Sequence, residues 1–414
     1  MRVAWSIGHD QAALGGVIMY TTLAVFAGLV LLYSLISRKV EDIWLSGPIV
    51  FVALGVVLGP LGLGWFSPSA DSISGKALID VTLALFLFVD AASADLSILK
   101  KHWRLPGRML LVGLPLNIAL GSVLALWLFP GLSTYEAAIL GTMLAATDAA
   151  LGKAVVTNQS VPHHLREGLS AESGLNDGLA VPFLLLFIAL EQGSAVRGEG
   201  VGLHLAAEEL GIGFAVGAIV AYGTARAISV ARQRGWLGSV WQRMSVPALA
   251  LLVFAIAQSN HGSGYIAAFV GGLFFRAGMK EDVHALVVPA EGIGEVLAMI
   301  AWILFGLMLV PAALPFVTGT HLLYAILSLT VIRMVPIVLS LTGSGETMRG
   351  QLFLAWFGPR GLASLAFATM VWAEDIPAAG TLIAVTIVTV LMSLVLHGIT
   401  AKPLSERLAS QSPG

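Results

Sequence analysis

The chain contains a long succession of apolar stretches, each close to the length that an α-helix needs to cross a lipid bilayer. Hydrophobic residues make up 57% of the 414 residues and charged residues only 11%, far from the composition of a soluble domain. Because about 20 apolar residues span the hydrocarbon core as one helix, the sequence predicts an all-α polytopic membrane protein. We place about thirteen spans, centred near Phe26, Val52, Leu87, Ile118, Leu144, Leu179, Val216, Leu252, Phe269, Ile300, Leu329, Ser364 and Thr386.

The basic residues predict the orientation of these spans. Of the 22 Lys and Arg residues, Arg2, Lys76 and Arg197 lie on one side of the membrane, Arg333 and Arg360 lie within spans, and all the others follow odd-numbered spans. Positively charged loops stay on the cytoplasmic side. We therefore expect the N-terminus outside, the C-terminus in the cytoplasm, and a location in the cell (inner) membrane.

Charge, cysteine content and loop length exclude several classes of protein. The formal net charge is -2 and the basic residues are scattered, so we expect no nucleic acid or nucleotide partner. The sequence contains no cysteine, which excludes disulfides and thiolate chemistry. The loops are short, and we expect no soluble regulatory domain. The function should therefore lie within the membrane, with the lipid bilayer as partner and no cofactor.

Two spans contain polar or helix-breaking residues near their middle. Thr147-Asp148 interrupts the fifth span, and the run from Gly358 to Gly361 (Gly-Pro-Arg-Gly) interrupts the twelfth. Corresponding interruptions in two halves of a chain are typical of inverted-repeat transporters whose broken helices meet at the membrane midplane. We predict one transmembrane domain over residues 1–414, with repeats at about 15–190 and 244–402 and a connecting span at 203–228.

The run from Ala171 to Gly178 places ionisable groups inside the sixth span. Glu172, Ser173, Asn176 and Asp177 fall within an arc of about 140° on a helix that turns about 100° per residue. Such groups are costly in lipid and usually functional, although Ser and Asn also join transmembrane helices without further role. Because hard cations prefer oxygen ligands, we predict that Asp177 binds an alkali cation and a proton in turn. Ser173 would complete the ligand shell, and Asn176 would orient Asp177 or line the cavity.

Two further carboxylates lie within spans. Asp148 follows Thr147 in a segment of small residues, where unwound backbone carbonyls would ligate a cation. Asp148 itself would ligate the cation directly, cap a half-helix or pair with an arginine, and these alternatives stay open. Asp90 in the third span would ligate the cation or face a water-filled funnel.

Arg333 and Arg360 each need an anionic partner, because an unpaired arginine in hydrocarbon is costly. Our preferred pairing is Glu172 with Arg333 and Asp148 with Arg360. This pairing leaves Asp177 and Asp90 to respond to ions. The sequence alone also allows the partners to be exchanged.

These motifs resemble the monovalent cation:proton antiporters, specifically the NhaP/NHE-like branch of sodium/proton exchangers. The resemblance rests on Thr147-Asp148, on Glu172-Ser173-x-x-Asn176-Asp177 and on Gly358 to Gly361, and it extends from Asp90 through Arg360. It implies thirteen spans in an NhaA/NhaP-like antiporter fold, a crossed pair of broken helices and a homodimer. It also implies an elevator-like shift of a core domain against a dimerisation domain.

The resemblance also implies a role for each matching residue. Asp177 would carry the cation or the proton, with Thr147 and Ser173 as cation ligands (Na+ or a similar ion). Asn176 and Asp148 would be supports. Glu172 would form a structural bridge with an arginine, and Asp90 matches an acidic position only loosely.

The resemblance implies a secondary active antiporter rather than an enzyme. Competition of a cation and a proton for one carboxylate predicts 1:1 exchange without net charge movement, most readily of Na+ for H+. A K+/H+ antiporter of the same fold is the first alternative. An intramembrane hydrolase is disfavoured because the sequence has no Gly-x-Ser-Gly or Gly-x-Gly-Asp run, and a cation channel because no repeated filter-like segment is present.

Overall fold

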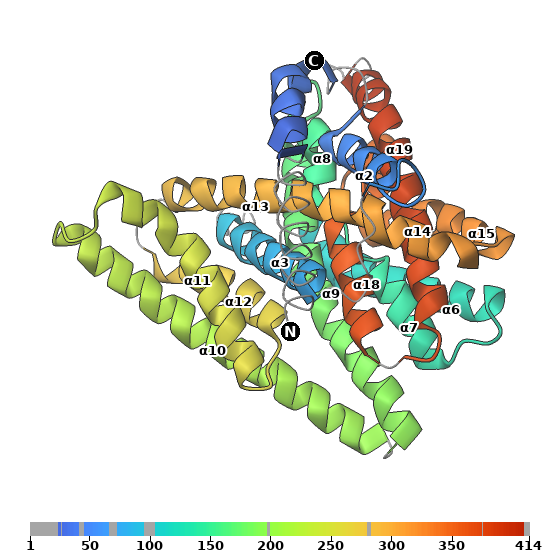
Figure 1. Ribbon diagram of the computed structural model, residues 1–414, viewed down its shortest axis with the longest axis horizontal. Helices are drawn as coiled ribbons and strands as arrows, with labels where there is room; N and C mark the ends of the chain where they lie inside the picture. The colour runs from blue at the N-terminus through green and yellow to red at the C-terminus, as the bar shows by residue number, and fades with distance from the viewer. Residues whose placement is uncertain are drawn as a thin grey trace, which may run out of the picture. The chain divides into compact units, whose positions relative to one another are not determined.

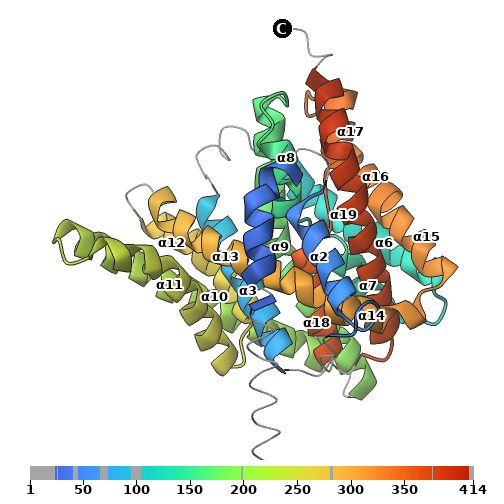
Figure 2. The same cartoon turned by 45° about the horizontal axis from the view of Figure 1, so that its top comes forward.

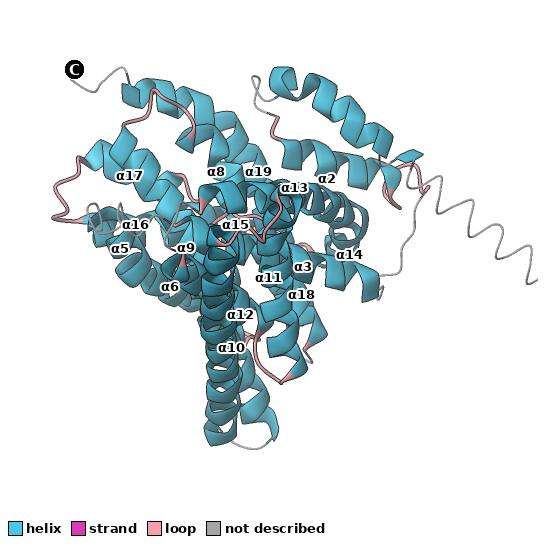
Figure 3. Ribbon diagram, turned by 90° about the vertical axis from the view of Figure 1, so that its left-hand side faces the viewer, coloured by secondary structure: helices cyan, strands magenta, loops and turns pink. Residues whose placement is uncertain are grey.

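The structure, a computed structural model, describes residues 24–25, 27–40, 45–65, 73–94, 104–196, 199–279, 283–374 and 376–409. Figure 3 shows helices joined by loops, and these described residues contain no β-strand. The predicted all-α class is therefore confirmed. Residues 1–47 form one compact unit and residues 48–414 another. In the first unit, residues 24–25 and 27–40 are helical.

Figure 1 shows the helices in chain order. Their bounds are α2 (Gly47–Leu58), α3 (Ile73–Ser93), α5 (Arg104–Arg108), η1 (Met109–Gly113), α6 (Leu114–Leu128), α7 (Thr134–Met143), α8 (Ala149–Val156), α9 (His163–Val196), α10 (Glu199–Gln233), α11 (Ser239–Ser259), α12 (Gly264–Gly278), α13 (His284–Leu304), η2 (Phe305–Leu309), α14 (Val310–Ala313), η3 (Leu314–Phe316), α15 (Gly319–Leu327), η4 (Ser328–Ile332), α16 (Arg333–Leu341), α17 (Met348–Trp356), α18 (Leu362–Ala373) and α19 (Ala379–Ala409).

The helices coincide with the predicted spans. Within the described residues, seven helical stretches are long and apolar enough to cross a membrane, and α2, α12 and α18 are shorter apolar helices. The predicted span centres from Val52 to Thr386 each fall within a helix or within the break of one. The first centre, Phe26, lies outside the described residues. The arrangement of spans therefore follows the hydropathy of the sequence.

The fifth and twelfth spans are broken where the sequence predicts. α7 ends at Met143 and α8 begins at Ala149, whereas α17 ends at Trp356 and α18 begins at Leu362. The two unwound segments touch, because the backbone N–H of Asp148 donates to the carbonyl oxygen of Pro359 at 2.8 Å. The crossed pair of broken helices is therefore present. The boundaries of the two repeats stay a prediction.

Within the part of the chain that the structure describes, three spans contain one π-helical turn each, and a proline explains each turn. The turns are η1, η2 and η4, and the prolines that follow them are Pro115, Pro311 and Pro336. A proline has no N–H to donate, and its ring clashes with the carbonyl four residues earlier. That carbonyl belongs in each case to the π turn. The helix widens there, as helices do where the regular bonding is interrupted.

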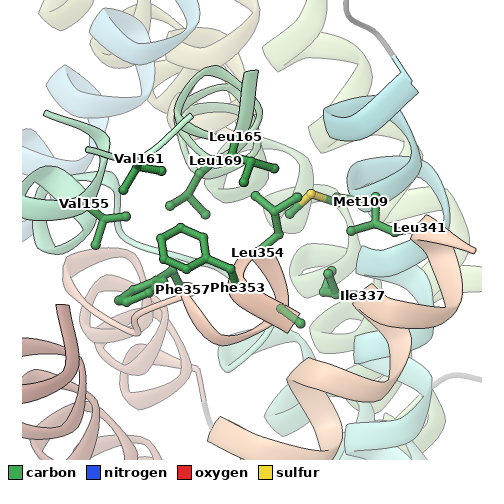
Figure 4. Close-up of a cluster of buried hydrophobic side chains, with 11 residues drawn as sticks. Met109, Val155, Val161, Leu165, Leu169, Ile337, Leu341, Phe353, Leu354 and Phe357 are labelled. Atoms are coloured by element: carbon green, nitrogen blue, oxygen red, sulfur yellow. The ribbon is translucent and has the colours of Figure 1, made fainter. Parts of the chain in front are cut away.

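α9 is the helix around which the candidate site is built. It lies between α3 on one side and α7 on the other, and it packs against both (Figures 1 and 2). Near the crossing, an apolar cluster joins α8, α9, α16 and α17 (Figure 4). Close van der Waals packing of this kind holds helices together in lipid. The cluster consists of Met109, Val155, Val161, Leu165, Leu169, Ile337, Leu341, Phe353, Leu354, Ala355 and Phe357.

Candidate functional site

Polar side chains of α9 meet the unwound segment between α7 and α8. Glu172, Ser173 and Asn176 are buried, with 3% exposure or less, and Thr147 is fully buried. Asp177, one turn after Ser173, is partly exposed. The helical repeat places these α9 residues on one face, and α9 packs against both α7 and α8. The structure thus brings together the polar residues of two predicted motifs.

The amide nitrogen of Asn176 ties α9 to the unwound segment. Nδ2 lies 3.1 Å from the carbonyl oxygen of Ala145, from Oγ1 of Thr147 and from Oε1 of Glu172. Oγ1 of Thr147 lies 3.5 Å from Oγ of Ser173. Thr147 and Ser173 are therefore neighbours, as a shared ligand shell requires. Their binding of an ion stays a prediction.

Asp177 has a buried oxygen atom that the protein does not satisfy. Its Oδ1 has no hydrogen-bond partner among the described residues, although the backbone N–H of Thr147 bonds to the carboxylate. A buried acceptor without a partner is costly. A proton or an alkali cation would remove that cost, since both bind carboxylate oxygen. Asp177 remains our prediction for the exchanging group.

Asp148 caps two helices at once. Its Oδ1 accepts the backbone N–H of Leu151 in α8 at 3.1 Å, and its Oδ2 accepts that of Leu362 in α18 at 2.8 Å. The first N–H groups of a helix have no partner within the helix, and a carboxylate there also complements the helix dipole. Among the alternatives for Asp148, capping is therefore what the structure shows. Direct ligation of a cation stays a prediction.

Glu172 and Arg333 form a buried ion pair. Nη1 of Arg333 lies 2.8 Å from Oε1 of Glu172, and Nη2 lies 3.1 Å from Oε2. Both side chains are only 1% exposed, and this two-bond geometry is the strong form of such a pair. A Cβ atom at Gly358 would clash with Nε of Arg333. The preferred pairing of these two residues is therefore present, and it needs the glycine beside it.

Arg360 requires a correction. Its Nη1 donates to the carbonyl oxygens of Ala145 and Ala146, each at 3.1 Å, while the carboxylate oxygens of Asp148 accept backbone N–H groups. Nε and Nη2 of Arg360 have no hydrogen-bond partner among the described residues. The expected Asp148–Arg360 ion pair is replaced by bonds to backbone oxygen. These carbonyls follow the end of α7, where the helix dipole favours a cation.

Asp90 lies beside α9 at the level of the site. Its side chain is partly exposed, and its Cβ lies 3.7 Å from the position that a Cβ atom of Gly174 would take. Gly174 stands between Ser173 and Asp177 in the sequence. Asp90 is therefore close enough to influence an ion in the site, and its direct ligation stays a prediction.

Sequence reasoning missed a polar cavity of about 510 Å³ between the ends of α3, α9, α10, α12 and α18. Asp80 and Tyr265 line it and share a hydrogen bond of 2.6 Å. Glu208, Glu209 and Glu374 also line it. A cavity with several carboxylates on its wall attracts cations. The sequence spacing gives no signal that groups Asp80, the neighbouring pair Glu208 and Glu209, and Glu374, because these three positions lie far apart in the chain.

We expect Gly361→Ala to disrupt the crossing. The added Cβ would overlap with Oδ2 of Asp148, so the carboxylate that caps α18 has to move. Loss of a helix cap typically costs about 1 kcal/mol, and displacement of the buried crossing adds to it. The unfolding temperature of the purified protein should decrease clearly. The matched control is Gly152→Ala in α8, where the new Cβ meets nothing within 4 Å, and an equal decrease there would contradict the prediction.

Known proteins resemble this chain in sequence. Residues 23–407 match the family described as "Sodium/hydrogen exchanger, transmembrane". The chain is 34% identical over 180 residues to Na(+)/H(+) antiporter 2 of Zygosaccharomyces rouxii, covering 42% of this chain and 22% of that protein. It is 22% identical over 397 residues to the K(+)/H(+) antiporter NhaP of Alkalimonas amylolytica, covering 93% of this chain and 67% of that protein.

A solved structure shares the fold. The sodium proton antiporter MjNhaP1 from Methanocaldococcus jannaschii at pH 8 superimposes with a TM-score of 0.77 at 21% sequence identity. The match covers 95% of this chain and 100% of that chain. The predicted NhaP-like fold is therefore confirmed. The chain spans only about a fifth of the length of the yeast relatives it matches.

Proposed function

Because this chain belongs to the sodium/hydrogen exchanger family, we propose that it is a secondary active antiporter that exchanges Na+ for H+ by alternating access. The cation and the proton compete for Asp177. Each binds from one side of the membrane and leaves on the other.

The observation that supports this proposal most directly is the state of the Asp177 carboxylate. One of its oxygen atoms is buried without a hydrogen-bond partner among the described residues, although the side chain is partly open. The other carboxylate of the motif, Glu172, is held by Arg333. Asp177 is therefore the acid of this motif that can take up a proton or a cation without breaking an ion pair.

The neighbours of Asp177 supply a set of oxygen ligands. In the proposal, Oγ of Ser173 and Oγ1 of Thr147 complete the shell around the cation, because hydroxyl oxygens suit hard cations. Their separation of 3.5 Å is compatible with both atoms facing one ion. Asn176 and Asp148 hold the unwound segment in place, and Asp90 adds negative charge nearby.

The proposed exchange is 1:1 and electroneutral. If either ion occupies the same carboxylate, each half-cycle moves one positive charge in the opposite direction from the other. An electrogenic cycle would instead respond to voltage by about 2.3 kcal/mol per charge per 100 mV. Exchange by this chain should therefore be insensitive to membrane potential.

K+ is the second candidate for the cation. A relative that aligns with 93% of the chain is named a K(+)/H(+) antiporter, whereas the relative with 34% identity is named a Na(+)/H(+) antiporter. Na+ and K+ differ only by fractions of an ångström in ligand distance. We therefore propose Na+ as the transported cation, with K+ as the second candidate.

We place the chain in the cell (inner) membrane as a homodimer, with its N-terminus outside and its C-terminus in the cytoplasm. The asymmetric distribution of Lys and Arg supports this orientation. The homodimer rests on the family resemblance.

The experiment that tests the proposal is ion exchange in proteoliposomes. A pH-sensitive dye inside the vesicles reports H+ movement after addition of Na+, Li+ or K+. We expect exchange with Na+ that is unchanged when a membrane potential is imposed. A sustained current at matched gradients would contradict electroneutral exchange, and exchange with K+ alone would select the second candidate.

A further inference from the structure

The end of α10 and the start of α11 form a surface that is basic and rich in exposed tryptophan. We call residues 226–243 the α10–α11 corner, which lies at an edge of the helices in Figures 1 and 2. Between Glu209 and Glu281 the sequence contains no Asp or Glu. The corner is therefore positively charged without acidic residues of its own. Its basic residues are Arg226, Arg232, Arg234 and Arg243.

A tight helix end fixes Trp236 within the corner. Gly235 has a φ of +69°, a backbone conformation that glycine adopts without strain. The N–H of Gly235 donates to the carbonyl oxygen of Arg232 at 3.0 Å, and that of Trp236 to Ala231 at 2.9 Å. These are the two bonds of a Schellman helix end. These bonds fix the backbone of Trp236 directly after the end of α10.

The side chains of the corner combine aromatic area with positive charge. Trp236 and Trp241 are 70% and 72% exposed. Cζ of Arg234 lies 4.8 Å from the ring centroid of Trp236, within the range of a cation–π contact. Arg243 is also exposed. Tryptophan rings at helix ends prefer the level of the lipid headgroups, and guanidinium groups bind phosphate through paired hydrogen bonds.

We propose that the α10–α11 corner binds the headgroup of an anionic phospholipid. Arg234 and Arg243 pair with the phosphate, and Trp236 and Trp241 lie at the boundary between headgroups and acyl chains. Clusters of basic residues next to a membrane span are the usual means of recognising such lipids.

Charge complementarity favours lipid over a second copy of the chain as the occupant. A twofold contact through this surface would bring two identical patches together. Each patch is basic, and neither supplies an acidic residue to offset the other. An anionic headgroup removes this repulsion, because it brings the opposite charge.

The test uses quenching of tryptophan fluorescence by brominated lipids. The full chain is reconstituted in phosphatidylcholine vesicles that contain a minor fraction of either brominated phosphatidylglycerol or brominated phosphatidylcholine. The chain has 10 Trp, so the signal of Trp236 is the difference between the wild type and Trp236→Phe. We expect the anionic lipid to quench Trp236 more strongly than the neutral lipid.

Paired variants show whether the arginines cause this preference. In Arg234→Gln/Arg243→Gln the preference for anionic lipid should fall by roughly fivefold for each arginine removed. The control Arg349→Gln/Lys402→Gln removes the same amount of charge from exposed positions elsewhere. This control should keep the preference for anionic lipid. The proposal would be overturned if both lipids quenched Trp236 of the wild type equally, or if the control variant lost as much of the preference for anionic lipid as the arginine variant. It would also be overturned if neither lipid quenched Trp236 because a second copy of the chain covers it.

Discussion

Asp177→Asn is expected to abolish cation/proton exchange, with a loss of at least about 100-fold. The amide is close in shape to the carboxylate, but it cannot take up a proton and brings no negative charge to a cation. The α9 helix and its contacts should persist, because none of the side-chain hydrogen bonds around Asn176 involves the Asp177 side chain. The measurement is dye-detected exchange in proteoliposomes with each cation in turn.

Glu406→Gln is the matched control for Asp177→Asn. Glu406 is an exposed carboxylate near the end of α19, and its conversion to the amide removes the same charge away from the crossing and from the polar cavity. We expect that variant to retain most of its exchange. The unfolding temperature of both variants should stay near that of the wild type. Unaltered exchange in Asp177→Asn would remove the central residue of the proposed function.

Single substitutions of Glu172 or Arg333 are expected to destabilise the protein by about 3–5 kcal/mol each. Each leaves the other charge buried without its partner, since both side chains are 1% exposed. Glu172→Gln keeps an acceptor for the bond from Asn176, and Arg333→Met keeps much of the buried volume. The loss of unfolding free energy in the double variant should be clearly smaller than the sum of the two single losses, because the double variant contains no unpaired charge. Thermal or denaturant unfolding in detergent measures the three losses.

The exposed pair Lys153–Glu295 provides a control for this cycle. Its atoms lie 2.9 Å apart, but the side chains are 65% and 53% exposed. Breaking it should change the free energy of unfolding by less than about 1 kcal/mol, because water already solvates both charges. Strictly additive losses for Glu172 and Arg333 would show that their contact contributes no stability of its own.

Much of the fold follows from local features of the sequence. Hydropathy places the spans because a chain in lipid has to satisfy its backbone groups within each helix. The breaks at Thr147-Asp148 and at Pro359 are also local, since proline, glycine and short polar residues interrupt helices by their own chemistry. The π turns were missed, although the prolines that cause them are visible in the sequence.

The partners of the buried charges were harder to predict. Glu172–Arg333 was the preferred pairing, but the residues are 161 positions apart, and the sequence allowed other partners. Arg360 binds the carbonyl oxygens of Ala145 and Ala146. Every residue carries such an oxygen, so side-chain identity gives no signal for this partner. Matching of charges therefore fails for Arg360, because the unwound backbone beside it offers its own carbonyl oxygens.

The double cap made by Asp148 has a consequence for how the protein is assembled. Its two helix partners lie far apart in the chain, with 214 positions between Asp148 and Leu362. When the fifth span leaves the ribosome, the second of these partners has not yet been synthesised. The midplane of the protein can therefore be completed only after the twelfth span has entered the membrane.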